Sequence, residues 1–233
     1  MYDHLFFDAD GTLWDFMASE RWALSLVFTE LGIEPTFEAI SAYSRINNAV
    51  WLEFEQGLIT LDILKIERFH RFQAHYGITI DPELSAKRYA EKLAQSYHLY
   101  ADTILVLDEL VKRRYPLSLI TNGISNIQRG RLAANGTQHY FEAIIISEEV
   151  GARKPDPEYF EIALKMARES GYPSHNPLVI GDSPTSDIRG AIDSGIDTCW
   201  INRYGMEKDK NTIATYEIKN LEELLPILDN RHN

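Results

Sequence analysis

Four acidic residues of this 233-residue chain stand at spacings that suit phosphate or metal chemistry. Asp8 and Asp10 stand two residues apart after a short apolar run, and Asp182 and Asp187 follow another such run. Strand alternation would turn Asp8 and Asp10 to the same side. Two carboxylates so close repel one another unless a cation lies between them or one carboxyl holds a proton. Hard oxygen ligands of this kind suit Mg²⁺, which keeps several waters and bridges to phosphate. The acidic residues therefore indicate a Mg²⁺ site.

Groups that could handle a phosphate accompany these acids. Asp8 is a candidate nucleophile, and Asp10 can donate and accept a proton. Lys154, in the sequence G-A-R-K-P-D-P, supplies a fixed positive charge. Thr121 and the backbone N–H of Asn122 are predicted to open a helix, where backbone donors favour phosphate binding. A lone D-x-D is usually a cap or a turn, and a lone lysine is usually a surface residue. The two acidic segments, the Lys154 segment and the Thr121-Asn122 segment occur together, and this combination favours a catalytic site.

Five short apolar runs would have to position these groups. They lie at residues 5–7, 117–120, 144–146, 178–180 and 198–201. None alternates cleanly, which is typical of strands buried on both faces of a parallel sheet. Helical patterns follow at about 103–114, 124–135, 156–171 and 185–195. Strands alternating with helices predict a doubly wound parallel α/β sheet, whose ligands bind beyond the carboxyl ends of the strands.

The segment between the first two strands differs, since residues from about 15 to 100 show no convincing strand. Apolar residues recur there at helical spacing, first at Leu24, Val27, Phe28 and Leu31 and again between 90 and 97. Two further helices are predicted at 36–55 and 60–76, with Thr36 and Thr60 as their N-caps. We therefore expect a discontinuous α/β core, residues 1–14 and 101–233, interrupted by a helical domain over 15–100.

Four motifs in this order carry a family resemblance. D-A-D-G-T-L, I-T-N-G, K-P-D-P and G-D-S-P-T-S-D resemble the motifs of the haloacid dehalogenase-like (HAD) hydrolases, and the resemblance covers the whole chain. It implies a Rossmann-like core in which the helical insert is a C1 cap. Four further stretches are similar to bacterial pyrimidine 5′-nucleotidases of house-cleaning type. They are F-F-D-A-D-G-T-L-W, W-L-E-F-E-Q-G-L-I-T, I-S-E-E-V-G-A-R-K-P and D-T-C-W-I-N.

The resemblance implies a two-step phosphoryl transfer. Asp8 would be the nucleophile that forms an aspartyl-phosphate, and Asp10 the general acid and base. The implied cofactor, Mg²⁺, would be held by the Asp8 carboxylate, the Asp10 backbone carbonyl and Asp182. Asp187 would orient metal-bound water or Lys154. Dehalogenases of the superfamily lack the acid at the position of Asp10, so its presence favours a phosphatase.

The same resemblance implies how the phosphate and the rest of the substrate are held. Thr121, Asn122 and Lys154 would bind the phosphate. Aromatic residues are frequent in the insert, where residues 14–100 hold 14 of the chain's 26. They could simply fill the core of a helical bundle, or one or two rings could contact a nucleobase. The candidate specificity residues are Trp14, Asn47 and Trp51.

Composition limits the partners of the chain. The formal net charge of −12 argues against a nucleic-acid polymer, whose binding usually needs a basic face. The single cysteine, Cys199, fits a reducing compartment, and no apolar run is long enough to span a membrane. We expect a cytoplasmic phosphatase of a small phosphorylated metabolite, with nucleoside monophosphates as the implied substrates, that is a monomer or a weak homo-oligomer. A sugar-phosphate phosphatase, a phosphomutase and a non-enzymatic phosphate-sensing module remain alternatives.

Overall fold

The computed structural model describes residues 2–207 and 213–229, in a chain that divides into two compact units. The first unit comprises Met1–Phe16 and His98–Asn233, and the second comprises Met17–Tyr97. The described strands all lie in the first unit, and the regular secondary structure of the second unit is helical.

A six-stranded parallel sheet forms the centre of the first unit. Its strands are β1 (His4–Asp8), β2 (Leu117–Thr121), β3 (Ala143–Ile146), β4 (Pro177–Gly181), β5 (Asp197–Ile201) and β6 (Tyr216–Ile218). Their order across the sheet is β3-β2-β1-β4-β5-β6, and each neighbouring pair is parallel. The five predicted strands are confirmed, but β6 was not predicted. It has three residues, of which only Ile218 is fully buried, so it leaves no pattern that a sequence reading can detect.

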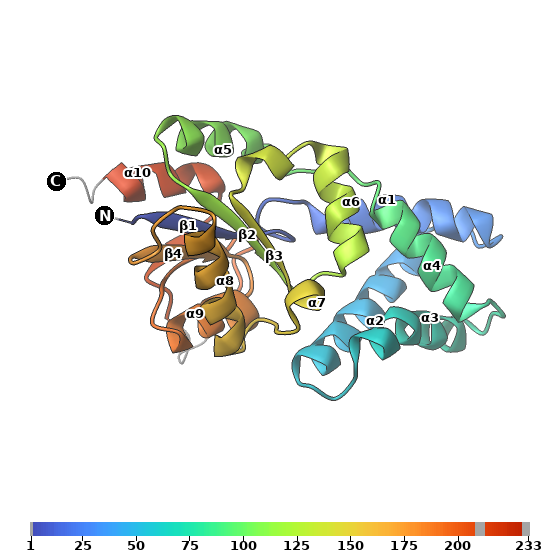
Figure 1. Ribbon diagram of the computed structural model, residues 1–233. Helices are drawn as coiled ribbons and strands as arrows, with labels where there is room; N and C mark the ends of the chain where they lie inside the picture. Colours follow the sequence, from blue (N-terminus) through green and yellow to red (C-terminus); the bar gives the residue numbers. More distant parts are fainter. Residues whose placement is uncertain (1, 208–212, 230–233) are drawn as a thin grey trace. The chain divides into compact units, whose positions relative to one another are not determined.

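Helices cover both faces of this sheet (Figure 1). Leu5 and Phe7 of β1 pack on one face, in a cluster that includes residues of α5 (Thr103–Lys112) and α10 (Leu224–Asp229). Phe6, between them in sequence, points to the opposite face. There it packs in a second cluster with residues of α8 (Pro157–Glu169) and α9 (Arg189–Asp193). These two hydrophobic layers confirm the predicted doubly wound α/β fold.

Short elements after the strands differ from the prediction. The helix expected over 185–195 is instead a π-helical turn, Pro184–Ile188, followed by the five residues of α9. In this turn the N–H groups of both Asp187 and Ile188 donate to the carbonyl of Ser183. The remaining elements of the unit are α6 (Ser125–Asn135), α7 (Ser147–Val150) and two 3₁₀ turns, Gln138–Tyr140 and Leu221–Glu223.

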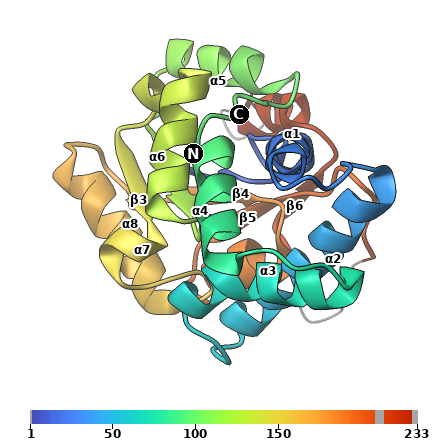
Figure 2. The ribbon, with the colours of Figure 1, turned by 90° about the vertical axis from the view of Figure 1, so that its right-hand side faces the viewer.

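The second unit contains the helices predicted in the insert. They are α1 (Phe16–Glu30), α2 (Phe37–Glu55), α3 (Leu61–Tyr76) and α4 (Pro82–Leu93). The hydroxyls of Thr36 and Thr60 accept the N–H groups of Ala39 and Ile63, so both predicted N-caps are confirmed. The helix α3 packs against both α2 and α4 (Figure 2). No helix in the described part of the chain is long and apolar enough to cross a membrane.

Candidate active site

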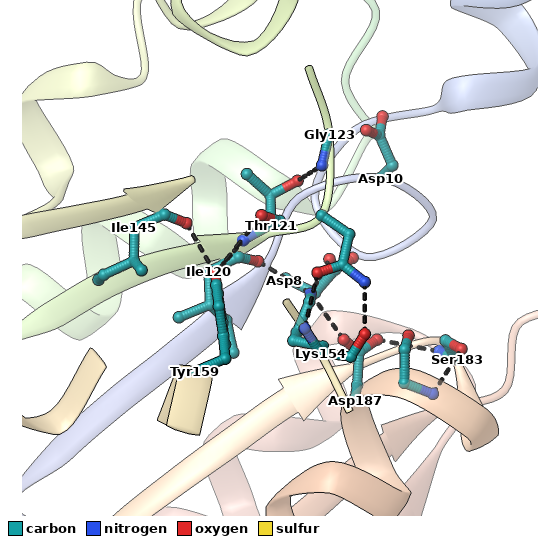
Figure 3. Close-up of polar contacts among 12 residues, drawn as sticks. Asp8, Asp10, Ile120, Thr121, Gly123, Ile145, Lys154, Tyr159, Ser183 and Asp187 are labelled. Carbon is teal, nitrogen blue, oxygen red and sulfur yellow. Dashed lines mark hydrogen bonds and ion pairs between the residues drawn. The ribbon is translucent and has the colours of Figure 1, made fainter. Parts of the chain in front are cut away.

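The site lies where β1, β2 and β4 end, because the carboxyl ends of parallel strands meet at one edge of the sheet. Asp8 is the last residue of β1, Thr121 is the last of β2, and Asp182 follows β4 directly. Lys154 comes from the loop before α8, which follows β3. Figure 3 shows Asp8, Thr121, Lys154 and Asp187 converging on this edge. The strand-end residues that the sequence singled out are therefore brought together.

Lys154 is the electrostatic centre of the site and is only 1% exposed. Its ammonium contacts Asp8 Oδ1 at 2.7 Å, Asp187 Oδ1 at 2.7 Å and the carbonyl of Ile120 at 3.1 Å. The contacts to Asp8 and Ile120 are hydrogen bonds, and the contact to Asp187 is an ion pair. Burial lowers the pKa of Lys154, but the charges of Asp187 and Asp8 outweigh burial, so the net shift of this pKa is upward.

The carboxylates form an acidic cluster around this lysine. Oxygen atoms of Asp8, Asp182 and Asp187 lie within 4.8 Å of one another. Burial raises the pKa of the Asp8 carboxyl to about 7, an effect that Lys154 opposes and Asp187 reinforces. Burial and the charge of Asp8 likewise raise the pKa of Asp182 well above its usual range. Ionising these groups therefore calls for more positive charge than Lys154 alone supplies.

This donor set fits a divalent cation. Three carboxylates against one ammonium leave an excess of two negative charges when all are ionised. Asp8 Oδ2 is buried and has no hydrogen-bond partner among the described residues, which is costly unless a cation or a substrate meets it. Oxygen-only ligands with few protein contacts are what Mg²⁺ takes. Asp187 lies in this cluster and also pairs with Lys154.

Asp10 departs from the predicted arrangement. The strand β1 ends at Asp8, and Asp10 lies in the turn beyond it, so strand alternation does not place the two carboxylates on one side. In Figure 3 the Asp10 side chain points away from Lys154. Its carboxylate instead accepts hydrogen bonds from two residues of α6, Gln128 and Arg131. Neither residue could be predicted from the sequence, because a glutamine and an arginine inside an amphipathic helix usually face solvent.

Asn122 also differs from the expectation. The helix α6 begins at Ser125, so Asn122 does not open it, and that prediction was wrong. The Asn122 side chain accepts the backbone N–H of Lys154 at 2.8 Å and donates to the Lys154 carbonyl at 2.7 Å. This paired contact joins the loop after β2 to the loop that carries Lys154. Asn122 therefore holds Lys154 in place.

Tyr159 of α8 is a further supporting residue, which no pattern in the sequence indicated. Its hydroxyl accepts the N–H of Thr121 at 2.8 Å and donates to the carbonyl of Ile145 at 2.8 Å. The side chain is fully buried, and burial raises its pKa. It fixes the ends of β2 and β3 relative to each other.

The three candidate specificity residues differ in how far they are buried. Trp14 is fully buried in the core of the first unit, with the Arg131 guanidinium 4.5 Å from its ring centre, so its predicted contact with a substrate is not supported. Asn47 is fully buried within the second unit, where Glu20 and Arg68 occupy its amide group. Burial therefore leaves neither side chain with an exposed surface that a substrate could contact. Trp51 is partly buried and packs edge-to-face on Phe54 of the same helix.

A parallel sheet with paired acids, a threonine and a lysine at its carboxyl edge defines a hydrolase of the HAD type. The family model for haloacid dehalogenase-like hydrolases matches residues 2–195. The chain belongs to this family, as its motifs predicted.

Individual relatives match over nearly the full length. The chain is 37% identical to the pyrimidine 5′-nucleotidase PynA of Streptococcus pneumoniae over 98% of this chain and 95% of that protein. It is 30% identical to the pyrimidine 5′-nucleotidase YjjG of Escherichia coli, over 97% of this chain and 98% of that protein. The crystal structure of the HAD-hydrolase YfnB from Bacillus subtilis, bound to magnesium, superposes with a TM-score of 0.90 at 35% identity. That match covers 98% of this chain and 99% of the YfnB chain.

Proposed function

We propose that this protein is a Mg²⁺-dependent phosphomonoesterase that works through an aspartyl-phosphate on Asp8. The observation that carries the proposal is the buried Asp8 carboxylate. Lys154 holds one of its oxygens at 2.7 Å, and the other has no partner among the described residues. Lys154 supplies positive charge beside this carboxylate, and Thr121, at the end of the neighbouring strand, supplies a hydroxyl donor for a phosphate. A carboxylate held in place in this way is a competent nucleophile without an adjacent base.

The first step transfers the phosphoryl group to the protein. A carboxylate oxygen of Asp8 attacks phosphorus, and the bond between phosphorus and the ester oxygen breaks. Asp10 gives its proton to the departing alcohol oxygen. Lys154 lowers the repulsion between Asp8 and the incoming phosphate, and the Thr121 hydroxyl holds a phosphate oxygen. Such transfers depend mainly on positioning and charge neutralisation.

The second step returns the protein to its starting state. Water attacks the phosphorus of the aspartyl-phosphate while Asp10 accepts the proton of that water. The bond between phosphorus and the Asp8 oxygen breaks, which releases inorganic phosphate and regenerates the Asp8 carboxylate. Asp10 is then protonated again, ready for the next substrate.

Asp8, the backbone carbonyl of Asp10 and Asp182 would hold Mg²⁺. When bound, the ion supplies positive charge to the phosphate and to the carboxylates around Lys154. Asp187 keeps Lys154 in position through its 2.7 Å ion pair and accepts the N–H of Ser183 at 3.0 Å. The Ser183 contact ties Asp187 to the loop that carries Asp182.

We infer that the substrates are nucleoside 5′-monophosphates with pyrimidine bases, such as UMP, dUMP and dTMP. The support is the near full-length similarity to PynA and YjjG, both of which are named pyrimidine 5′-nucleotidases. Trp51 of the helical unit is the residue that we propose to influence the choice of base. Its ring is partly buried, and base–aromatic stacking contributes about 1–3 kcal/mol.

Phosphate release from a mixed panel tests the activity and the substrate class separately. The panel contains purine and pyrimidine mono-, di- and triphosphates, sugar phosphates and p-nitrophenyl phosphate, each with Mg²⁺ and with EDTA. We expect pyrimidine monophosphates to give the highest kcat/KM and EDTA to abolish turnover. Sugar phosphates that exceed every nucleotide would contradict the substrate class while leaving the phosphatase intact. No release from any compound would contradict the activity itself.

A further inference from the structure

Two residues of α6 hold the Asp10 carboxylate, one on each oxygen. Arg131 Nη1 forms an ion pair with Asp10 Oδ1, and Gln128 Nε2 donates to Asp10 Oδ2 at 2.9 Å. Gln128 and Arg131 stand three residues apart, so they lie on the same side of the helix. Both are 1% exposed, whereas 30% of the Asp10 side-chain surface is accessible. The Asp10 carboxylate is thus held by hydrogen bonds on its buried side and is accessible on its opposite side.

Gln128 also reaches the residue at the end of β2. Its Nε2 donates a second hydrogen bond, of 2.8 Å, to Thr121 Oγ1, which also accepts the N–H of Gly123 at 3.0 Å. A hydroxyl has two acceptor sites and one donor hydrogen. Because both acceptor sites are filled by N–H donors, the Thr121 hydroxyl is left to act as a donor, which is what a phosphate oxygen requires.

The surroundings of Gln128 and Arg131 are shaped to hold them. The Arg131 guanidinium lies 4.5 Å from the ring centre of buried Trp14, a favourable cation–π contact. Gly123 leaves room for the Gln128 amide, since a Cβ on residue 123 would stand 2.2 Å from Gln128 Nε2. A larger residue at position 123 would force Gln128 out of its place.

We propose that Gln128 and Arg131 are positioning residues that hold Asp10 as general acid at a fixed place relative to the phosphate bound by Thr121. This inference rests on the proposed phosphatase function. The bonds of 2.9 and 2.8 Å through one nitrogen place Asp10 Oδ2 within two hydrogen-bond lengths of Thr121 Oγ1. A phosphate with its ester oxygen can span that separation, so Thr121 can hold the phosphate while Asp10 faces the leaving oxygen.

The contacts of Gln128 and Arg131 with the Asp10 carboxylate are compatible with proton transfer. A carboxylate has about four lone-pair sites, and the bonds from Gln128 and Arg131 fill one on each oxygen. A site on each oxygen therefore remains for the proton that the leaving group receives. The two residues fix the direction of that site and do not themselves touch the substrate.

Leaving-group dependence distinguishes this role from simple structural support. Phenyl phosphate needs its departing oxygen protonated, whereas p-nitrophenyl phosphate leaves readily without an acid. We expect Gln128→Met to lower kcat/KM for phenyl phosphate by about 10- to 100-fold, within the range that a misplaced general acid costs. For p-nitrophenyl phosphate we expect a clearly smaller loss, which comes from the Thr121 contact alone, because the acid contributes little there. Gly123→Ala and Arg131→Lys should show the same selectivity, which keeps the test usable if Gln128→Met does not fold.

Three control variants calibrate the measurement. Asp10→Asn should give the largest difference between the two esters. Thr121→Val should lower kcat/KM for both esters, because it removes a contact to the phosphate that both share. Arg129→Gln replaces a neighbouring α6 side chain that is exposed and pairs with Glu149. This variant should leave kcat/KM for both esters unchanged.

Each outcome decides one of the two proposals. An equal loss on both esters in Gln128→Met, or no loss, would overturn the positioning role while leaving the phosphatase in place. If the wild-type protein hydrolysed neither ester nor any nucleotide, the function itself would fall, and the positioning role with it.

Discussion

Lys154 sets the charge balance of the candidate site. It is buried, it contacts Asp8 and Asp187 at 2.7 Å each, and its loop is fixed by the paired bonds to Asn122. One ammonium cannot compensate three carboxylates, so burial and mutual repulsion raise the pKa values of Asp8 and Asp182. A cation at these carboxylates would reverse that effect.

This balance predicts how the metal-free protein responds to pH. The pKa of Asp8 rises from its ordinary acidic value to about 7 on folding, so at intermediate pH the folded protein holds a proton that the unfolded chain has lost. Stability in EDTA should therefore fall as pH rises from about 5 to 8. At pH 8, Mg²⁺ should restore the stability of the protein and raise its Tm by several degrees. Thermal unfolding at each pH, with EDTA and with Mg²⁺, measures both effects.

Asp8→Asn is the matched control for this pH effect. His4, whose pKa is lowered by burial, is present in both proteins, so its contribution to the pH dependence cancels in the comparison. The variant should lose Tm less steeply with rising pH than the wild type does. Two results would contradict this charge balance. One is a wild-type Tm in EDTA that stays constant or rises with pH, and the other is the same dependence of Tm on pH in both proteins.

Asp182 should act through the metal. We expect Asp182→Ala to lower kcat and to raise the Mg²⁺ concentration for half-maximal activity by at least about tenfold, since one ligand is lost. Asp193→Ala is the control, because Asp193 is an exposed acid of α9 that pairs with Arg189. A Mg²⁺ titration of phosphate release measures the shift. The same titration midpoint in Asp182→Ala and wild type would remove Asp182 from the ligand set.

At the level of the elements, the sequence predicts what depends on local pattern. Continuous apolar runs followed by acids identified β1 and β4, and a run followed by Thr-Asn-Gly identified β2. The residues that end these strands meet at one edge as expected. The contacts of α6 could not be predicted, because they depend on which turn of a helix faces Asp10. The interrupted segment 184–193 was also missed, since a π turn and a helix of five residues each are too short to leave distinct periodicities in the sequence.

The packing of α9 gives a prediction about Lys154. A Cβ on Gly190 would lie 2.7 Å from Pro155 Cα and 2.5 Å from a ring carbon of Phe160. Pro155 follows Lys154 directly, so backbone must move if Gly190 is replaced. Gly190→Ala should destabilise the protein by about 1–3 kcal/mol, as overpacking does, and should also lower kcat. Denaturant unfolding and phosphate release measure the two losses.

Gly136→Ala separates packing from backbone strain in that experiment. Gly136 has a φ of +71° and open space around its Cα, so its replacement strains the backbone without pressing on a neighbour. It should reduce stability and leave kcat unchanged. If Gly190→Ala lost stability but kept full kcat, the link between α9 and Lys154 would be wrong.

At the scale of the whole molecule, the helical insertion is evident from the sequence but its use of aromatic residues is not. Phe28, Tyr43, Phe69, Phe72 and Tyr89 pack on one another inside the second unit. Buried Glu20, Asn47 and Arg68 form a polar network in the same unit. Most of the aromatic excess therefore serves the bundle core. Composition alone cannot separate rings that pack from rings that bind.

Trp51 provides the test of whether the helical unit affects substrate choice. We expect Trp51→Ala to lower kcat/KM for UMP by about tenfold, since loss of one stacked ring costs about 1–3 kcal/mol. The loss for p-nitrophenyl phosphate should be smaller, because it carries no base. Leu52→Ala, at an exposed neighbouring position, should change neither. Steady-state kinetics with both substrates decide the matter, and equal losses would make Trp51 a packing residue.

The covalent intermediate on Asp8 is the central claim, and reduction with borohydride tests it most directly. Borohydride converts an aspartyl-phosphate to homoserine, which mass spectrometry of peptides locates. Protein quenched during turnover of UMP or p-nitrophenyl phosphate with Mg²⁺ should carry homoserine at residue 8 and at no other aspartate. Protein without substrate, and the Asp8→Asn variant, which should also have lost turnover while remaining folded, should carry none. Rapid turnover with no homoserine at residue 8, or with homoserine at another aspartate, would contradict the account.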